Sequence, residues 1–173
     1  MSRQTIYTSS WVNLHVDRVA FPGGRIVEQY HIVEVAHDGV GVLAVNEAGE
    51  ILLVKAYRYT TESLNWEIPA GLQEDGETVI QTAEREALEE TGWKTSEHRL
   101  IYSFHPINGI SNHTFHIVTC HAVSGSDSWD QDEVERVRWF SKAELKELIK
   151  QHEINDGLTL VSLLIFLNDD LSL

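Results

Sequence analysis

The chain has 173 residues, 42% of them apolar, which is enough to bury the core of a single domain with room for a small addition. Its 13 Lys and Arg residues stand against 27 Asp and Glu residues, and this formal net charge of −14 excludes a basic surface for nucleic acid. No apolar run is long enough to span a membrane, and the single cysteine, Cys120, cannot form an intramolecular disulfide. We therefore expect a cytoplasmic protein with no nucleic-acid partner and no membrane partner.

Segments with the alternation typical of β-strands come first in the chain. Residues 11–16 and 26–35 flank a Pro-Gly-Gly turn, so we expect a β-hairpin ahead of the main sheet. Residues 40–45 and 51–57, joined by a turn at 46–49, predict a second and more buried hairpin. Further strands are predicted at residues 102–104, 114–123 and 134–140.

Helical patterns alternate with these strands. Ser141 with Glu144 caps a predicted helix that runs to about Gln151. Asp156 caps a last helix over residues 158–167, which is apolar on nearly every side and therefore suits a core or an interface. Together with the acidic helix described next, these elements predict the α/β class: an α/β/α sandwich with a mixed sheet, plus an N-terminal antiparallel β-hairpin.

The most informative segment begins with a loop at Gly71 and continues into an acidic helix. Thr78, followed three residues later by Gln81, is a capping-box start, and Gly92 is a left-handed stop, so residues 79–91 are predicted to be helical. One stripe of this helix is apolar and should face the sheet: Val79, Ile80, Ala83 and Ala87.

An acidic stripe lies beside the apolar one and carries Glu86, Glu89 and Glu90. Two glutamates four residues apart repel each other by about 0.2–0.5 kcal/mol in a bare helix. One interpretation is a solvated acidic face. The other is a site for a hard divalent cation, Mg²⁺ or Mn²⁺, because such ions take several oxygen ligands. Zinc fits less well, since no Cys or His lies in the segment.

The fixed residues of this segment follow one spacing: Gly71, five residues, Glu77, seven residues, Arg85-Glu86, two residues, Glu89-Glu90, one residue, Gly92. This spacing resembles the Nudix box of the Nudix hydrolases, and every fixed position of that box is filled. Ala87 and Trp93 stand where the pattern usually has a bulky aliphatic residue, a difference that concerns packing rather than catalysis.

The resemblance implies hydrolysis of a nucleoside diphosphate linked to another group, with Mg²⁺ or Mn²⁺ held by the helix glutamates. By position in the box, Glu86 and Glu90 would be direct metal ligands, and Glu89 would bind a metal or its bound water. Arg85 would orient the glutamates, and Glu77 would shape the loop.

Two further stretches, Leu53-Val-Lys-Ala-Tyr-Arg58-Tyr and Trp66-Glu67-Ile-Pro69-Ala70-Gly71, resemble the ADP-ribose and nucleoside-diphosphate-sugar pyrophosphatases. This branch implies that the carbonyl group of Ala70 completes the metal shell. It also implies that Arg58 and Glu67 lie near the substrate, while the alternative is that Arg58 is a strand residue paired with a nearby acid.

Relatives in this branch are typically homodimers whose N-terminal strands cross onto the partner. The resemblance therefore implies that residues 1–37 form a dimerisation region and that residues 38–173 form the Nudix hydrolase domain. We expect a homodimer on that basis.

A catalytic base outside the box is often supplied in this branch by an acid in the loop before the last strand. Asp130, Asp132, Glu133 and Glu135 compete for that place. Glu133, at the mouth of the predicted strand, is our first choice and Asp132 the second. The alternative is a solvated acidic loop.

The loop downstream of the box departs from the branch. Asn108 stands where a proline is usual, and His113 stands near the expected acid, so we predict that His113 contacts the substrate. That loop normally helps to choose the sugar, which leaves ADP-ribose and other nucleotide sugars open. A zinc site is disfavoured, because His116 and His121 fall on opposite faces of a predicted strand and no second cysteine exists.

The sequence therefore predicts divalent-metal-dependent hydrolysis of the pyrophosphate bond of a nucleoside diphosphate sugar, ADP-ribose or a related compound, to NMP and a sugar phosphate. One alternative is a nucleoside triphosphate pyrophosphohydrolase. A second is a non-catalytic module that senses nucleotide sugars, which would be expected to lack a box glutamate.

Overall fold

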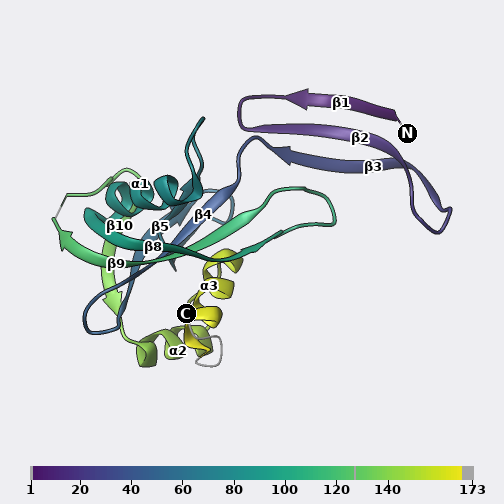
Figure 1. The fold of residues 1–173 in the computed structure, drawn as a ribbon. Helices are drawn as coiled ribbons and strands as arrows, with labels where there is room; N and C mark the ends of the chain where they lie inside the picture. The colour runs from purple at the N-terminus through teal and green to yellow at the C-terminus, as the bar shows by residue number, and fades with distance from the viewer. Residues whose placement is uncertain (1, 127, 169–173) are drawn as a thin grey trace.

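The computed structural model describes residues 2–126 and 128–168, and its strands form two separate sheets (Figure 1). The N-terminal sheet has the antiparallel order β1 (Ser2–Thr8), β2 (Val12–Ala20), β3 (Ile26–Val35). The hairpin expected over residues 11–35 is confirmed. Strand β1 was not expected, because every one of its residues is exposed and its sequence shows no buried alternation.

The second sheet has the order β10-β5-β4-β9-β8, with β6 (Ser63–Glu67) added to β5 and β7 (Ala70–Leu72) added to β4. Strands β4 (Gly39–Val45) and β5 (Ile51–Arg58) pair only next to their connecting turn, at Val45 and Ile51. Beyond that pair the two strands separate, so the predicted second hairpin is confirmed only next to its turn.

After the separation each strand takes other partners. Strand β4 pairs with β7 and runs parallel to β9 (Phe115–Gly125), while β5 pairs with β6 and β10 (Val134–Phe140). The predicted mixed sheet is therefore confirmed. Strand β8 (Trp93–Phe104) is much longer than the predicted 102–104, because three register shifts interrupt the alternation by which a sequence reveals a strand.

Helices cover both faces of this sheet (Figure 1). Helix α1 (Val79–Thr91) packs through Ala83 and Ala87 against Val40, Val42 and Val118. The opposite face is covered by α2 (Lys142–Lys150) and α3 (Gly157–Leu167), whose buried residues pack against the other side chains of the same strands. The expected three-layer sandwich is therefore observed.

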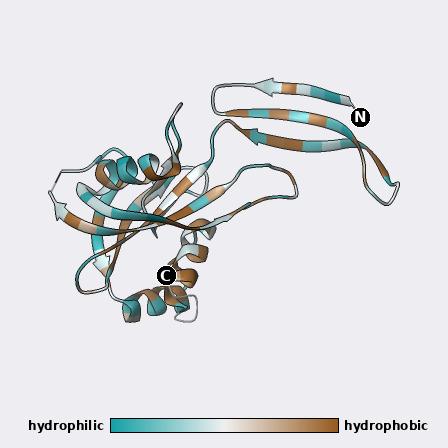
Figure 2. Cartoon of the chain, in the orientation of Figure 1, coloured by the Kyte–Doolittle hydropathy of each residue, from teal (hydrophilic) through white to brown (hydrophobic). Residues whose placement is uncertain are grey.

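Helix α3 is the most hydrophobic helix of the chain (Figure 2). Leu163 is fully buried in the core, whereas Leu164 on the other side is 51% exposed. Thus α3 covers the sheet and still presents apolar surface. Within residues 2–126 and 128–168 no helix is long and apolar enough to cross a membrane.

The N-terminal sheet extends away from the sandwich and lies beside the loop between β8 and β9 (Figure 1). The Tyr30 hydroxyl donates a hydrogen bond of 2.5 Å to the Gly109 carbonyl, and the Val33 N–H donates one of 2.8 Å to the Ile110 carbonyl. These contacts hold the end of the N-terminal sheet next to the sandwich, where the turn between β1 and β2 reaches the functional site.

Candidate active site

The site is built on α1, whose two ends are set by local sequence. The Thr78 side chain accepts from the N–H of Gln81, the Gln81 side chain accepts from Thr78, and Gly92 adopts a left-handed φ of 71°. The predicted capping box and helix stop are therefore confirmed. Of the predicted acidic stripe, Glu86 and Glu90 are each 8% exposed, whereas the Glu89 side chain is 56% exposed.

Gly71 brings β7 close to the first of these buried carboxylates. A Cβ atom placed on Gly71 would lie only 2.0 Å from Oε1 of Glu86. A side chain at this position would therefore push Glu86 away from the strand. The glycine of the box is required by this close approach, since its φ is not in the left-handed region.

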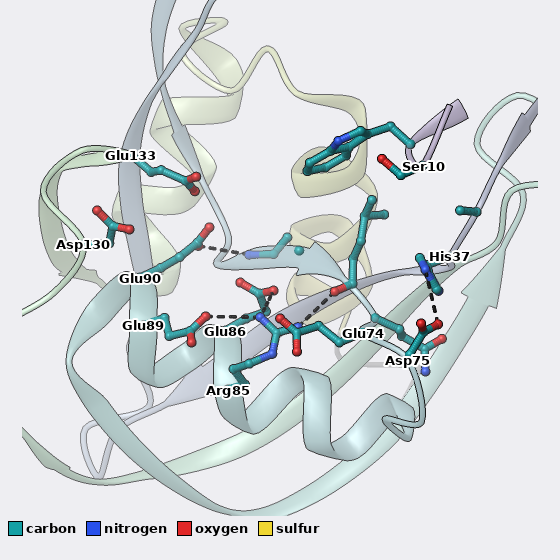
Figure 3. A pocket seen from close by; sticks show the side chains of 16 residues that line it. Ser10, His37, Glu74, Asp75, Arg85, Glu86, Glu89, Glu90, Asp130 and Glu133 are labelled. Carbon is teal, nitrogen blue, oxygen red and sulfur yellow. Dashed lines mark hydrogen bonds and ion pairs between the residues drawn. The ribbon is translucent and has the colours of Figure 1, made fainter. Parts of the chain in front are cut away.

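Arg85 holds the acidic residues in place (Figure 3). Its Nη1 atom lies 2.6 Å from Glu86 Oε1 and 3.1 Å from Glu89 Oε2, and its Nη2 atom donates to the Leu72 carbonyl. Its Nε and Nη2 atoms also donate to the two oxygens of Glu77 at 2.9 and 3.0 Å. These bonds use the planar fork of the guanidinium group, so lysine could not replace them.

Glu77 fastens the loop that precedes α1. In addition to Arg85, it accepts hydrogen bonds from the Glu74 N–H and from the Thr82 hydroxyl, each at 2.9 Å. The hydrogen bonds from Arg85 are the main reason that the pKa of Glu77 is lowered to about 2. Glu77 is therefore a structural anion, fully ionised near neutral pH.

In contrast to Glu77, Glu90 lies in an environment that raises its pKa. Its carboxylate accepts a 3.1 Å hydrogen bond from the Ala70 N–H, but burial, together with the negative charge of Glu86, raises the pKa of Glu90 to about 8. Burial also raises the pKa of Glu86, against the lowering effect of Arg85. Two buried carboxylates with raised pKa values at one place are typical of a functional site.

A cleft of about 860 Å³ is bordered by Arg85, Glu86, Glu89 and Glu90 (Figure 3). Glu133 and Asp130 lie on the wall opposite Arg85, and Glu133 is close enough to raise the pKa of both Glu86 and Glu90. The Asp130 N–H donates to the Glu89 carbonyl at 2.9 Å, which fastens this loop to α1. Neither Asp132 nor Glu135 borders the cleft.

The N-terminal sheet supplies residues that the sequence analysis did not propose. Ser10 and Trp11, in the turn between β1 and β2, border the cleft, as does His37. The Trp11 side chain stays 72% exposed, so its indole ring is available to a bound molecule. The sequence marks this place at the cleft only by a tryptophan next to two serines. Its position opposite the glutamates could not be predicted, because they are far away in the chain.

Arg58, Glu67 and His113 lie elsewhere, in a cavity of about 240 Å³ on the other side of β7. Glu67 is 4% exposed and accepts hydrogen bonds of 3.0 and 2.6 Å from Nε and Nη2 of Arg58. Burial lowers the pKa of His113, so its imidazole is neutral near pH 7. Ala70 borders both the cavity and the cleft, which makes the two spaces neighbours.

Residues 35–160 of the chain match the NUDIX domain. This chain belongs to the Nudix family. It is 31% identical to an "ADP-ribose pyrophosphatase" of Bacillus subtilis (strain 168) over 92% of the chain and 86% of that protein. It is 29% identical to a "CMP-5'-(N-acetyl-N-hydroxy-3-aminopropyl)phosphonate hydrolase" of Streptomyces rubellomurinus (strain ATCC 31215), over 93% of the chain and 78% of that protein.

A solved structure described as an "ADP compounds hydrolase" superposes with a TM-score of 0.84 at 18% identity, covering 99% of this chain and 92% of that one. At that identity the likeness shows a shared fold. With the family match, it confirms the predicted Nudix hydrolase and its resemblance to the ADP-ribose pyrophosphatase branch.

The donor groups of the Nudix cleft suit a hard divalent cation. Within residues 2–126 and 128–168 no three Asp, Glu, His or Cys side chains form a finished ligand cluster, since Arg85 engages Glu86 and Glu89 remains at the surface. The buried carboxyl groups of Glu86 and Glu90 are nevertheless a set of oxygen donors, and a bound cation would favour their ionised forms. The residues therefore fit the metal that the family generally uses.

Proposed function

We propose that the chain hydrolyses the pyrophosphate bond of a nucleoside diphosphate sugar to NMP and a sugar phosphate, with Mg²⁺ or Mn²⁺ as the cofactor. The observation that carries this proposal is the charge of the cleft. Arg85 is already engaged by three glutamates. Apart from His37, the other titratable side chains on the cleft wall are carboxyl groups: Glu74, Asp75, Glu86, Glu89, Glu90, Asp130 and Glu133. A diphosphate would be repelled here without an added cation.

The metal would be held by Glu86 and Glu90, with Glu89 and the Ala70 carbonyl as further ligands. When bound, it would supply Lewis-acid polarisation of the phosphate and a more acidic water molecule. The chain itself contributes orientation: Arg85 fixes the positions of Glu86 and Glu89, and Gly71 leaves the space that the Glu86 carboxylate needs.

Proton transfer would fall to Glu133. It lies across the cleft from Arg85, no ion pair holds it among residues 2–126 and 128–168, and its field already acts on Glu86 and Glu90. A carboxylate so placed can accept the proton of the attacking water. Asp130 borders the same wall and is the second candidate, in place of Asp132, which lies outside the cleft.

The nucleotide would lie toward the N-terminal sheet. Trp11 offers an exposed indole at the rim of the cleft, and stacking on an aromatic ring accepts any nucleobase. The opposite end of the substrate would then point toward Arg58, Glu67 and His113 in the neighbouring cavity. One relative is named for ADP-ribose and another for a CMP compound, which agrees with a site tolerant of the base.

We further propose that the protein is a homodimer formed through residues 1–37. The N-terminal sheet carries exposed apolar side chains, among them Ile6 at 52%, Tyr7 at 57% and Ile26 at 49%, and a second copy would cover them. Light scattering of the pure protein tests this. A monomeric mass at micromolar concentration would contradict it.

A cytoplasmic location is likewise a proposal, supported by the single buried thiol of Cys120, which suits a reducing compartment. The formal net charge of −14 supports the absence of nucleic-acid and anionic-membrane partners. The same acidity is compatible with one small anion bound together with a cation.

A product-resolved assay tests the activity. The pure protein is incubated with Mg²⁺ and ADP-ribose, GDP-mannose, UDP-glucose or a nucleoside triphosphate, and the products are separated. NMP and a sugar phosphate are the predicted products. NMP and pyrophosphate from the triphosphates would instead identify a triphosphate pyrophosphohydrolase, and no cleavage with either Mg²⁺ or Mn²⁺ would favour a sensing module.

A further inference from the structure

Thr82 is a buried polar residue of α1 that lies between the fixed positions of the box. Its side chain is fully buried, and a buried hydroxyl group needs a hydrogen-bond partner. The hydroxyl donates to Oε2 of Glu77 at 2.9 Å, and the carbonyl oxygen of Thr78 is a second acceptor at 3.2 Å. Because a hydroxyl carries one hydrogen atom and Glu77 is ionised, the shorter bond to the carboxylate is the stronger of the two.

Packing alone does not explain a threonine at this position. Alanine is the better helix former, and valine has the same shape without a polar group to bury. The adjacent residue of the helix, Ala83, shows that a small apolar side chain packs well at this depth. What distinguishes Thr82 from these two alternatives is its hydrogen bond to Glu77.

The Glu77 carboxylate is held at both of its oxygens. Oε1 accepts from Nε of Arg85, while Oε2 accepts from Nη2 of Arg85, from the Glu74 N–H and from the Thr82 hydroxyl. Arg85 contributes most to the lowered pKa of Glu77, and Glu74 and Thr82 contribute as well. Because a β-branched side chain has little freedom at χ1 in a helix, Thr82 holds Oε2 at a defined place beside α1.

Arg85 connects Glu77 to the buried Glu86. The guanidinium group that binds Glu77 through Nε and Nη2 places its Nη1 atom 2.6 Å from Oε1 of Glu86 (Figure 3). Since this group is planar and rigid, the orientation of the Glu77 carboxylate determines where Nη1 lies. Thr82 does not border the cleft, so any effect that it has on Glu86 must pass through these two residues.

We propose that Thr82 is a positioning residue for the cation site: its hydroxyl orients Glu77, Glu77 orients Arg85, and Arg85 places the Glu86 carboxylate. This inference rests on the proposed function and adds to it a residue outside the cleft that increases the affinity for the cation. Groups that orient metal ligands by hydrogen bonds commonly affect metal affinity in this way.

The test measures Mn²⁺ affinity in the full-length protein without substrate, from the electron paramagnetic resonance signal of free Mn²⁺. Thr82→Val and Thr82→Ala both remove the hydroxyl, the first keeping the shape and the second favouring the helix, whereas Thr82→Ser keeps the hydroxyl. Thr91→Val is the matched control, because Thr91 is buried in the same helix and its hydroxyl donates to the Ala87 carbonyl instead of a carboxylate. The melting temperature of each variant is measured in parallel.

Thr82→Val and Thr82→Ala should each weaken Mn²⁺ binding by about three- to tenfold, less than the effect of about 10–100-fold at residues that hold a metal ligand directly. Thr82→Ser should bind Mn²⁺ nearly as well as the wild-type protein. Thr91→Val should keep the wild-type affinity even if its melting temperature falls, since its hydroxyl has no connection to Glu77 or Arg85.

Wild-type affinity in both variants without the hydroxyl would overturn the proposal, as would an equal loss in Thr91→Val or in Thr82→Ser. Each of these results would leave the proposed function standing, because the wild-type protein would still bind Mn²⁺. If the wild-type protein binds no Mn²⁺, the proposed function falls, and the role of Thr82 falls with it.

Discussion

Strand β7 separates two spaces of opposite character. On one side the cleft gathers Glu86, Glu89 and Glu90 around a single, already engaged Arg85. On the other side the cavity is mainly apolar, and Arg58 is neutralised by Glu67. The difference indicates that the cleft needs a cation before it can hold an anion, whereas the cavity suits an uncharged group.

The largest effect is expected when a buried carboxyl group is removed from the cleft. Glu90→Gln should lower kcat/KM by more than about 100-fold, since even residues outside the ligand shell contribute about 10–100-fold at metal sites. The fold should persist, because the amide can still accept the hydrogen bond from the Ala70 N–H. Steady-state kinetics and circular dichroism measure the two effects.

Glu84→Gln is the matched control, since Glu84 is exposed on the same helix and does not border the cleft. It should retain wild-type kinetics. Equal losses in the two variants would show that the charge of the helix, and not the buried site, matters.

The second prediction concerns the short distance between Gly71 of β7 and the Glu86 carboxylate. Gly71→Ala should lower turnover about 10–100-fold, because a Cβ atom would occupy the place of the Glu86 carboxylate and displace a proposed ligand. The matched control is Gly109→Ala, where nothing lies within 4 Å of the added atom. Wild-type turnover in Gly71→Ala would show that the position of Glu86 is unimportant.

A smaller effect is expected at the rim of the cleft. Trp11→Ala should raise KM about tenfold and change kcat little, because a stacked base contributes about 1–3 kcal/mol and is remote from the reacting bond. Tyr59→Ala removes an aromatic ring that is 83% exposed but outside the cleft, and it should leave KM unchanged. A fall in kcat alone would contradict the stacking role.

The smallest expected effect is on the pH dependence of the free energy of unfolding of the metal-free protein. The pKa of Glu90 is raised from 4.5 to about 8 in the folded protein, so between these pH values the folded chain keeps a proton that the unfolded chain has released. The free energy of unfolding should therefore fall as the pH rises from about 4.5 through about 8. In EDTA the melting temperature should decrease over this range, and Glu90→Gln should decrease less. Parallel pH profiles would contradict the buried position of Glu90.

The parts of the fold that were predictable are those whose signals are local. The capping box at Thr78 and the stop at Gly92 predicted the bounds of α1 as observed, and the Ser141 and Asp156 caps predicted the last two helices to within one residue at each end. Strand β10 was predicted with its observed bounds, because it is a short run rich in valine and aromatic residues.

The strands that were missed depend on pairing between distant residues. Strands β6 and β7 are short and separated by Pro69, and they exist because β5 and β4 offer them hydrogen-bonding edges. Within the site, Glu86 and Glu90 lie together on the predicted helix face, whereas Glu89 is exposed. The pairing of Arg58 with a nearby acid was one of two alternatives, and the structure identifies that acid as Glu67, which neighbours it through the pairing of β5 with β6.

In the proposed function, the buried pair Glu86 and Glu90 holds a divalent cation. Titration of the protein with Mn²⁺, followed by the electron paramagnetic resonance signal of free Mn²⁺, tests it without reference to any substrate. We expect that the wild-type protein and Glu84→Gln remove Mn²⁺ from solution equally and that Glu90→Gln binds it much more weakly. Equal binding by Glu90→Gln, or no binding by the wild-type protein, would contradict the account.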